Sequence, residues 1–265
     1  MDTLVFKAAP SPLLIQAASL ASRRWGPAVG GWLVGLPLTS GPIAFFLAVD
    51  QGGALPQPRP QDRLPAPPRK PDFCAAYGRA ARRFSWSVAF SAGTGAFVAG
   101  VILLDAVQMP LWALMLMVQT TLAAALALPP RLPPDLAQIP APARWDLPAR
   151  MLVATMLVVT LTSAAPLLGA RLAGMLATFP VFATVLTVFA HRAQGEKAAQ
   201  RVLRGLLRGL FAYTGFFFLI ALAIERIGIA LSFASASLVA CVIQLSTLRI
   251  IRGWPAIGRS RIGCD

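Results

Sequence analysis

Residues 205–224 read GLLRGLFAYTGFFFLIALAI, and residues 228–248 read GIALSFASASLVACVIQLSTL. Each stretch is predominantly apolar and has the length of about 20 residues that a helix needs to cross the hydrocarbon core of a bilayer. The sequence therefore predicts an all-α fold, a polytopic transmembrane helix bundle of about eight helices. The six other predicted spans lie at 4–21, 26–49, 84–104, 107–128, 150–169 and 171–190.

The composition agrees with this architecture. Hydrophobic residues make up 57% of the 265 residues and charged residues 13%, whereas a soluble domain carries about 25% charged residues. On a soluble protein the net charge of +14 would suggest a nucleic-acid partner, but here the basic residues lie between the apolar stretches. Cys74, Cys241 and Cys264 are too scattered for a metal site or a disulfide framework. Because Ala, Arg and Pro are frequent and Lys is rare, we expect a bacterial inner-membrane protein.

Basic residues are distributed unequally over the gaps between the predicted spans. When the gaps are assigned alternately to two sides, one side holds 20 of the 24 Lys and Arg residues. Since positive charge is retained in the cytoplasm during insertion, the sequence predicts that both termini are cytoplasmic. The opposite side holds Arg23, Arg24, Arg171 and Arg226. An Arg–carboxylate contact is predicted on that side within at least one of two groups, Arg23, Arg24 and Asp105 or Arg171, Glu225 and Arg226.

The two halves of the chain repeat one another. Residues 26–52 align without a gap with 169–195, at an offset of 143, and Thr94-Gly95 aligns with Thr214-Gly215 at an offset of 120. The first copy therefore carries an insertion. Because each copy has four spans, we predict two parallel four-helix repeats, related by an axis along the membrane normal. The identical pairs in the aligned block are Gly26/Gly169, Gly31/Gly174, Leu33/Leu176, Pro37/Pro180, Phe46/Phe189, Gln51/Gln194 and Gly52/Gly195.

The repeat defines the domain organisation. Proline-rich stretches account for the insertion and for the connection between the copies, and the one from Ala54 to Phe73 is predicted to be extended because proline disrupts helices. Both are interpreted as spacers, with a partner-binding polyproline ligand as the alternative. The segments are a first repeat at 1–128 with a Pro-rich cytoplasmic insertion at about 53–75, a Pro-rich linker at 129–148, a second repeat at 149–250 and a basic cytoplasmic tail at 251–265.

The second repeat carries a short apolar motif. Residues 173–183 read AGMLATFPVFA, and Gly195 follows twelve residues later. This pattern resembles that of the GlpM-like small bacterial inner-membrane proteins, in which AG, four residues, FP, one residue and FA follow one another. The resemblance covers about 150–248, and in the first half Leu36-Pro37-Leu38-Thr39-Ser40 stands in place of the aromatic run. It implies embedding in the membrane and no settled biochemical activity.

Residues typical of catalysis are sparse. The sequence has no phosphate-loop motif and no HExxH motif. Its single histidine, His191, lies at a predicted span end, as do Asp50, Asp105 and Glu225. An intramembrane hydrolase needs a base beside its nucleophile, and a proton-coupled machine commonly keeps an acid within the membrane. We therefore expect no enzymatic activity, no cofactor and no metal ion.

Two prolines break predicted spans at matching positions of the two repeats. Pro37 lies near the middle of 26–49, and Pro180 lies near the middle of 171–190. A proline frees the carbonyl four residues earlier, and matched broken helices are typical of transporter binding sites. We predict a transporter of a small neutral or zwitterionic solute, with a midplane site between the repeats. The predicted substrate-binding residues are Pro37, Thr39, Ser40, Thr94, Thr178, Pro180, Thr184 and Thr214.

Other interpretations stay open. If the prolines and threonines serve packing alone, the protein is a non-transporting membrane scaffold or an accessory factor for cell-envelope assembly. Gly26-xxx-Gly30 and Gly31-xxx-Gly35 have the spacing of close helix contacts. Two arginine stripes are predicted to face lipid head groups, with a funnel for an anionic substrate as the alternative. The stripes are Arg79, Arg82 and Arg83, and Arg201, Arg204 and Arg208.

Overall fold

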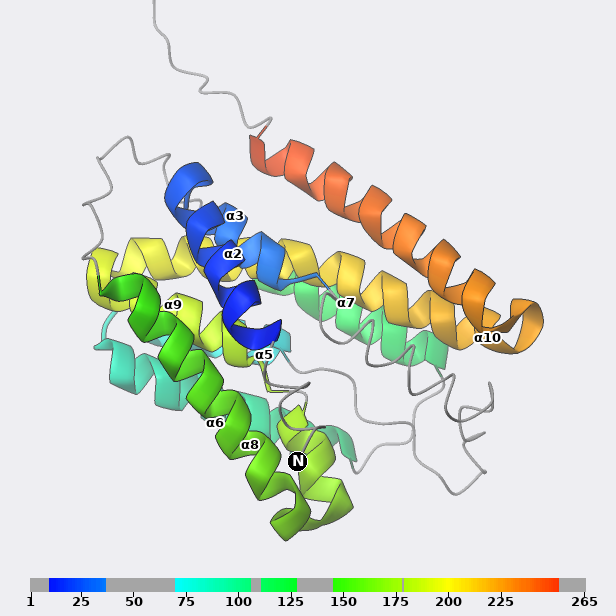
Figure 1. Ribbon diagram of the computed structural model, residues 1–265, viewed down its shortest axis with the longest axis horizontal. Coiled ribbons are helices and arrows are strands. Elements are labelled where there is room, and N and C mark those ends of the chain that lie inside the picture. The colour runs from blue at the N-terminus through cyan, green and yellow to red at the C-terminus, as the bar shows by residue number, and fades with distance from the viewer. Residues whose placement is uncertain (1–9, 37–69, 106–110, 128–144, 178, 253–265) are drawn as a thin grey trace, which may run out of the picture.

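The computed structural model describes residues 10–36, 70–105, 111–127, 145–177 and 179–252, and all regular structure within these ranges is helical (Figure 1). The prediction of an all-α fold is confirmed for these residues. Four residues of the predicted site lie outside them, namely Pro37, Thr39, Ser40 and Thr178. The helices are α2 (Pro10–Trp25), α3 (Pro27–Val34), α5 (Lys70–Ala80), α6 (Trp86–Asp105), α7 (Leu111–Ala127), α8 (Asp146–Ala177), α9 (Val181–Gln194) and α10 (Glu196–Arg252).

Three helical segments are long and apolar enough to cross a membrane. They are Trp86–Leu103 in α6 and the two parts of α10, Glu196–Ile224 and Arg226–Arg249. A shorter apolar segment, Met115–Ala127, lies in α7. These segments coincide with four of the predicted spans, and they place the chain in the class of helical membrane proteins.

Glycines form the two sharp bends around α10. At Gly228 φ is 76°, a backbone conformation that a residue with a Cβ rarely adopts, and there the helix reverses into a second half that runs back along the first (Figure 1). At Gly195 φ is 80°, and α9 passes into α10. The predicted boundary between the last two spans is therefore confirmed. The first of them begins at Glu196 rather than at residue 205.

One predicted boundary is wrong. The sequence predicts a turn near residue 170, but α8 continues without interruption from Asp146 to Ala177. A single glycine such as Gly169 costs a helix only about 1 kcal/mol, and Pro166 is accommodated inside α8 as prolines in membrane helices can be. The chain breaks instead at Pro180, which precedes α9.

A second expectation is also wrong. The Pro-rich stretch is predicted to be extended as far as Phe73, but α5 begins at Lys70. Pro71 is tolerated in the first turn because the N–H groups there have no intrahelical acceptor. The helix buries Phe73 and Tyr77 completely, and the Phe73 ring lies so close to Gly93 of α6 that an added Cβ would approach it to 2.9 Å. α5 is therefore an amphipathic helix packed on α6.

The predicted close contact of Gly31-xxx-Gly35 is confirmed, and its partner is α10. A Cβ on Gly31 would overlap the backbone of α10, and a Cβ on Gly205 would overlap the backbone of α3. A Cβ on Gly35 would lie 2.5 Å from the Cα of Gly209. Two pairs of glycines at helical spacing thus let the two backbones meet without side chains between them.

The second half of α10 also contacts α3, through hydrogen bonds to Trp32. The indole N–H of Trp32 donates to Oγ1 of Thr247 at 3.1 Å. The side-chain amide of Gln244 donates to the carbonyl oxygen of Trp32, also at 3.1 Å. Both bonds lie in an apolar environment, where polar groups without partners are costly. α3 is therefore fixed between the two halves of α10.

One pair of helix ends has the spacing of the predicted repeat. α3 ends at Val34 and α8 ends at Ala177, and the two positions are 143 residues apart, the offset of the aligned blocks. In both copies the aligned proline follows three residues later. The tandem repeat and the domain boundaries derived from it stay predictions.

Candidate functional site

A polar stripe runs along one face of α9. Pro180, Thr184, Thr187 and His191 lie three or four residues apart and therefore share this face. Thr184 and Thr187 are 3% and 0% exposed, and neither Oγ1 has a hydrogen-bond partner among the described residues. A threonine within a helix can donate to the carbonyl one turn earlier, and these two do not. The stripe therefore carries two unused hydroxyl donors in the interior.

The break at the start of this stripe is a tight turn. Pro180 has φ −81° and ψ 62°, and the N–H of Val181 donates to the carbonyl of Phe179 at 2.9 Å, which is the geometry of an inverse γ-turn. The N–H of Thr184 then donates to the carbonyl of Pro180 at 2.9 Å. The predicted helix break at Pro180 is confirmed, and its role in a binding site stays a prediction.

α6 runs alongside α9 in the opposite direction. At one end, the guanidinium of Arg192 lies 5.3 Å from the centre of the Trp86 ring. At the other end, the rings of Phe97 and Phe179 are 5.4 Å apart and nearly perpendicular. The two helices are therefore side by side over the whole length of the polar stripe.

This register relates two of the predicted site residues, Thr94 and Thr184. Thr94 is one turn from the Phe97 contact, so it lies within about one helical turn of the level of Thr184. Its Oγ1 is also buried without a hydrogen-bond partner in the described part of the chain. Thr214 differs, because its Oγ1 donates within its own helix to the carbonyls of Leu210 at 3.0 Å and Phe211 at 3.1 Å. The hydroxyls of Thr94 and Thr184 thus lack partners in the described ranges, whereas the hydroxyl of Thr214 already donates and retains only its acceptor capacity.

The aromatic residue of the FP motif has a packing role. Phe179 lies edge-on to Phe97 and also to Phe73 of α5, with ring centroids 6.3 Å apart in the second pair. Perpendicular aromatic pairs of this kind are favourable beyond the area that they bury. Phe179 thus holds α5 and α6 against the break at Pro180.

A tyrosine–histidine pair lies at the far end of the stripe. The hydroxyl of Tyr77 and Nδ1 of His191 are 3.1 Å apart. Burial lowers the pKa of His191, although the charge of Glu196 acts in the opposite direction. Burial also raises the pKa of Tyr77, so the phenol keeps its proton. A neutral imidazole can then accept the Tyr77 O–H at Nδ1.

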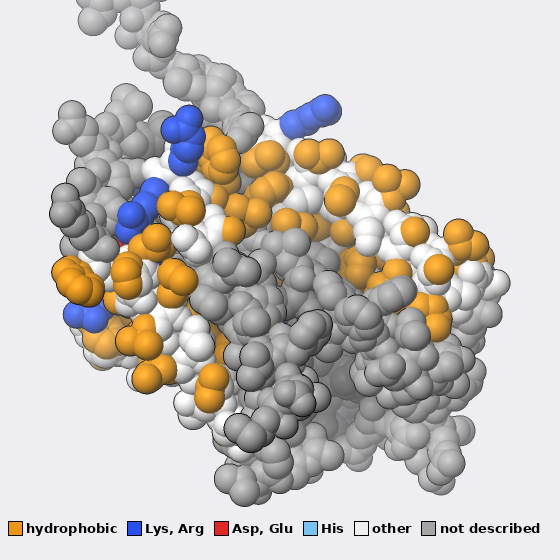
Figure 2. Space-filling model, in the orientation of Figure 1, with side chains coloured by type: hydrophobic (Ala, Val, Ile, Leu, Met, Phe, Trp, Pro, Cys, Tyr) orange, Lys and Arg blue, Asp and Glu red, His pale blue; other side chains and the backbone are white. Residues whose placement is uncertain are grey.

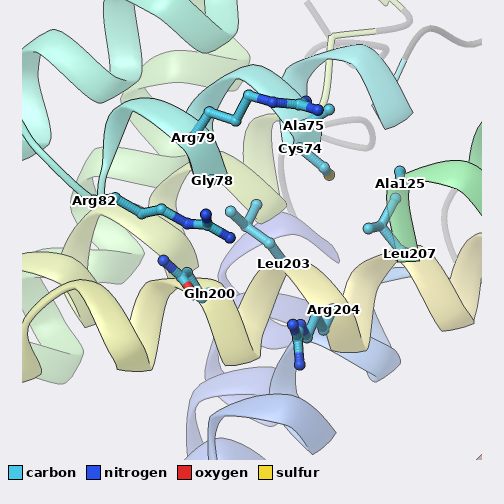
Figure 3. Close-up of a pocket in the computed structure, with 10 residues that line it drawn as sticks. All are labelled: Cys74, Ala75, Gly78, Arg79, Arg82, Ala125, Gln200, Leu203, Arg204 and Leu207. Atoms are coloured by element: carbon cyan, nitrogen blue, oxygen red, sulfur yellow. The ribbon is translucent and has the colours of Figure 1, made fainter. Parts of the chain in front are cut away.

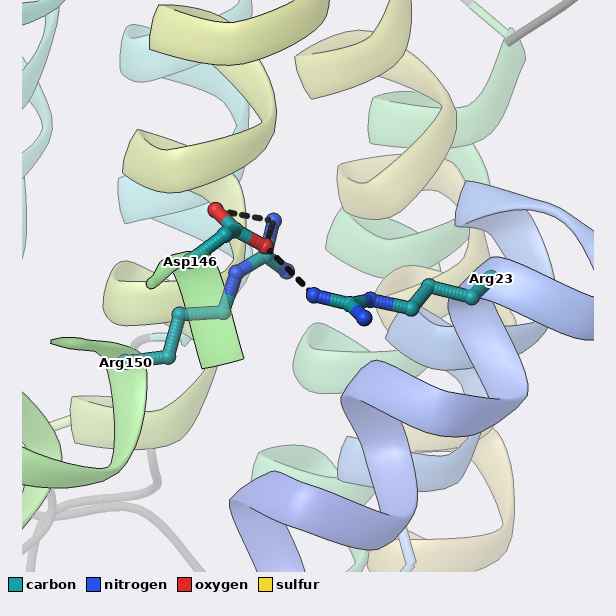
Figure 4. A network of polar contacts seen from close by, with 3 residues as sticks. All are labelled: Arg23, Asp146 and Arg150. Carbon is teal, nitrogen blue, oxygen red and sulfur yellow. Dashed lines mark hydrogen bonds and ion pairs between the residues drawn. The ribbon is translucent and has the colours of Figure 1, made fainter. Parts of the chain in front are cut away.

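An ion-pair network overturns part of the predicted topology (Figure 4). Asp146 accepts from Arg23 of α2 at 3.2 Å and from Arg150 of α8 at 3.0 Å. The sequence assigns Arg23 and these two residues to opposite sides of the membrane, so the placement of Arg23 is wrong. Arg23 does contact a carboxylate, as predicted for its group, but the partner is Asp146 instead of Asp105. The cause is the first hydrophobic stretch, where α2 ends at Trp25 on the side of Asp146.

Arginines gather at the end of the molecule where α9 passes into α10, which we call the basic end. It includes the Arg23–Asp146–Arg150 network, Arg192 beside Trp86, and the start of α10. Figure 2 shows Lys and Arg side chains near the left and upper edges of the visible face and hydrophobic side chains over much of the rest of its coloured part. Through its contact with Asp146, Arg23 lies with the arginines of this end.

A small pocket opens at the basic end. Its volume is about 70 Å³, and it lies between α5, α7 and the start of α10. Figure 3 shows Arg82 extending from the α5–α6 connection toward Gln200 and Leu203 of α10. The two arginine stripes identified in the sequence meet here. Gln200 is not identified in the sequence, because no motif or spacing singles it out. The lining residues are Cys74, Ala75, Gly78, Arg79, Arg82, Ala125, Gln200, Leu203, Arg204 and Leu207.

Two observations concern metal ligands and thiols in the described ranges. No group of three or more His, Cys, Asp or Glu residues there could hold a metal ion. The thiol of Cys74 is buried, and burial raises its pKa, which keeps it protonated and unreactive.

Comparisons with three kinds of reference give no match. No family model, no curated protein and no solved structure matches the chain. The chain is therefore described as a helical membrane protein on the strength of its three long apolar segments. The GlpM-like resemblance of residues 173–183 stays a proposal.

Proposed function

We propose that this chain is a multi-pass inner-membrane protein, related to the GlpM-like proteins, that transports a small neutral or zwitterionic solute. The observation that carries the proposal is the set of buried hydroxyls of Thr94, Thr184 and Thr187, which lack partners among the described residues. A buried polar group without a partner costs about 1–3 kcal/mol. A solute that hydrogen-bonds to these hydroxyls would offset that cost, which gives the solute its affinity.

The arrangement also supports a route for the solute. The stripe on α9 leads from the break at Pro180 to His191 at the basic end, and α6 runs antiparallel beside α9. A helix break of this kind allows the two flanking helices to move separately. In the proposed site, Thr214 adds an acceptor. Pro37, Thr39, Ser40 and Thr178 lie outside the described residues and belong to the proposal on the strength of the sequence alone.

The charge of the stripe favours a neutral or zwitterionic solute. Between Pro180 and His191 the stripe carries hydroxyl groups and no carboxylate or ammonium group. An ion in such a place would lack a counter-charge, and charges within a membrane are costly without one. Hydroxyls instead match amide, hydroxyl or paired zwitterionic groups of a small solute.

The basic end is proposed to face the cytoplasm, because positive charge is retained there. The two halves of α10 are antiparallel, and Leu248 packs near Ala21 and Val29, so the chain leaves α10 at this end. Reporter fusions after Arg252 and at Asp105 should give opposite signals. Matching signals would contradict the proposed orientation.

Transport can be measured without knowing the natural solute. The purified full-length protein is reconstituted in liposomes, and light scattering follows solute entry for glycerol, urea, glycine and glycine betaine. At least one solute should enter clearly faster than into protein-free liposomes. Thr184→Val should lower this rate by about tenfold, the equivalent of one lost hydrogen bond. Thr121→Val is the control, because Thr121 on α7 already donates to the carbonyl of Met117.

The same measurement addresses the alternative. If no solute of the panel enters faster than through lipid alone, and Pro180→Ala changes nothing, transport through this site is rejected. The buried hydroxyls would then be packing features. The non-transporting scaffold or accessory factor for cell-envelope assembly would become the leading interpretation.

A further inference from the structure

The pocket at the basic end combines two kinds of lining. Arg79 and Arg82 come from α5 and the connection that follows it, and Arg204 comes from α10. Leu203 and Leu207 form an apolar wall beside them. Guanidinium groups beside an apolar surface suit a ligand that has an anionic group attached to carbon chains.

The pocket also contains a neutral donor. Gln200 is 8% exposed and lines the pocket, where its side-chain amide can donate. Arg82 extends toward it in Figure 3. An amide and a guanidinium that converge on one point can donate together to one oxyanion, in the way that phosphate oxygens accept several hydrogen bonds.

The arginines on the α5 side are not neutralised by the described part of the chain. The ion pairs found there involve Asp146 with Arg23 and Arg150, and neither Arg79 nor Arg82 takes part in one. Arg79, Arg82 and Arg204 line one small pocket, and the like charges of their guanidinium groups repel one another. A bound anion would relieve that repulsion.

The size of the pocket limits the ligand. A water molecule needs about 10–15 Å³ of such space, so roughly five non-hydrogen atoms fit. This is the size of a phosphate group and is too small for a nucleotide base or a peptide. Any larger part of the ligand has to extend outward along the apolar wall.

We propose that this pocket binds the phosphate group of an anionic ligand, with Arg82, Arg204 and Gln200 as its donors. Two sources carry this chemistry, the head group of an anionic phospholipid and a free phosphate compound. The pocket is lined by α5, α7 and α10, so the proposal does not depend on solute transport along α9. The apolar wall and the position at the basic end favour the phospholipid.

Native mass spectrometry of the full-length protein in a neutral detergent can test this. Phosphatidylglycerol is added to the protein and to three variants, and its dissociation constant is measured. Arg82→Gln should raise the constant by about tenfold, because a charge-assisted bond is lost. Ala75→Phe, which fills the pocket without changing the charge, should have a similar effect. Arg83→Gln is the matched control, since Arg83 is exposed and does not line the pocket.

Competition then identifies the source of the phosphate. If millimolar inorganic phosphate leaves bound phosphatidylglycerol in place, the ligand is the lipid. If inorganic phosphate displaces the lipid from the protein but not from Arg82→Gln, the ligand is a free phosphate compound at the same site. If Arg82→Gln and Arg83→Gln weaken binding equally, or Ala75→Phe has no effect, binding is a general surface attraction and the proposal is wrong.

Discussion

α3 and α9 both pack inside the helical body, but they do so in opposite ways. α3 meets α10 through Gly31 and Gly205, backbone against backbone, and the polar groups of Trp32 are engaged by Gln244 and Thr247. α9 meets α6 through aromatic side chains and leaves buried hydroxyls without partners in the described ranges. The α3–α10 contact satisfies its polar groups. The α6–α9 contact leaves hydroxyl groups that make no hydrogen bond within the described residues.

The difference has an energetic meaning. Close backbone packing gives van der Waals contact, which is a main source of helix association in lipid, and it orders no side chains. A buried hydroxyl without a partner works against stability. The proposed binding site gives Thr184 and Thr187 a role other than stability, which would account for this cost next to a helix break.

The largest effect is expected where the backbones touch. Gly31→Leu places a side chain where even a Cβ overlaps the backbone of α10. Overpacking of a well-packed core costs about 1–3 kcal/mol, and a backbone clash lies at the upper end of that range. We expect the variant to unfold or aggregate at a temperature well below that of the parent, as measured by size-exclusion chromatography of heated samples in detergent.

Gly95→Leu is the control for this prediction. Outside its own helix backbone, Gly95 of α6 has no atom of the described residues within 4 Å of an added Cβ, so the substitution meets open space there. Its thermal stability should stay close to that of the parent, because leucine is also the better helix former. Equal losses in the two variants would mean that α3 and α10 are not in backbone contact.

The sequence predicts the α3–α10 contact only from one side. Gly31-xxx-Gly35 has a recognisable spacing, but Gly205-xxx-Gly209 is interrupted by Arg208 and is read as part of an arginine stripe. The spacing of small residues shows that one face of a helix can approach another helix closely. It does not show which helix packs on that face. The partner is set by three-dimensional packing, which a single sequence does not encode locally.

The errors of the sequence analysis have physical causes. The sequence predicts two spans within residues 150–190, divided near the middle, because the prediction relies on the length of the apolar stretch. In the described residues of this stretch the helix breaks only at Pro180. The assignment of Arg23 depends on counting every apolar stretch as a full crossing, and α2 is only 16 residues long. A helix of this length spans about 24 Å, less than the hydrocarbon core. The hydroxyls of the candidate site are identifiable by residue type, but their lack of partners is visible only after packing.

For α9 we expect a smaller effect on stability, and a gain instead of a loss. Thr184→Val and Thr187→Val replace a buried hydroxyl by a methyl group of nearly the same size. Because the hydroxyls have no partner among the described residues, their removal should raise stability by about 1 kcal/mol each. Thermal unfolding in detergent measures this, and the transport assay should show a loss for the same variants.

Thr214→Val provides the contrast. Its Oγ1 donates to carbonyls of its own helix, so the substitution removes a hydrogen bond instead of an unused group. Stability should stay unchanged or fall slightly. A loss of stability in Thr184→Val that matches or exceeds the loss in Thr214→Val would show that the α9 hydroxyl is satisfied, and the comparison between α3 and α9 would fail.

The smallest effect concerns pH and the end of the α9 stripe. Burial lowers the pKa of His191 from its usual 6.5, with Glu196 acting in the opposite direction. The folded state therefore binds this proton less readily than the unfolded state does. The contribution of His191 to stability is complete above about pH 6.5 and is lost as the pH falls through the lower pKa of the folded state.

Protonation of Nδ1 would also remove the acceptor for the Tyr77 hydroxyl, which lies 3.1 Å away. We expect the unfolding temperature to fall between about pH 7.5 and pH 5, and His191→Asn to reduce that fall, because asparagine does not titrate. Tyr77→Phe removes the hydrogen bond and keeps the histidine, so it should lower stability at neutral pH and retain a pH dependence. If His191→Asn keeps the full pH dependence of the parent, the effect arises from other groups, and α9 has no titratable contact with α5.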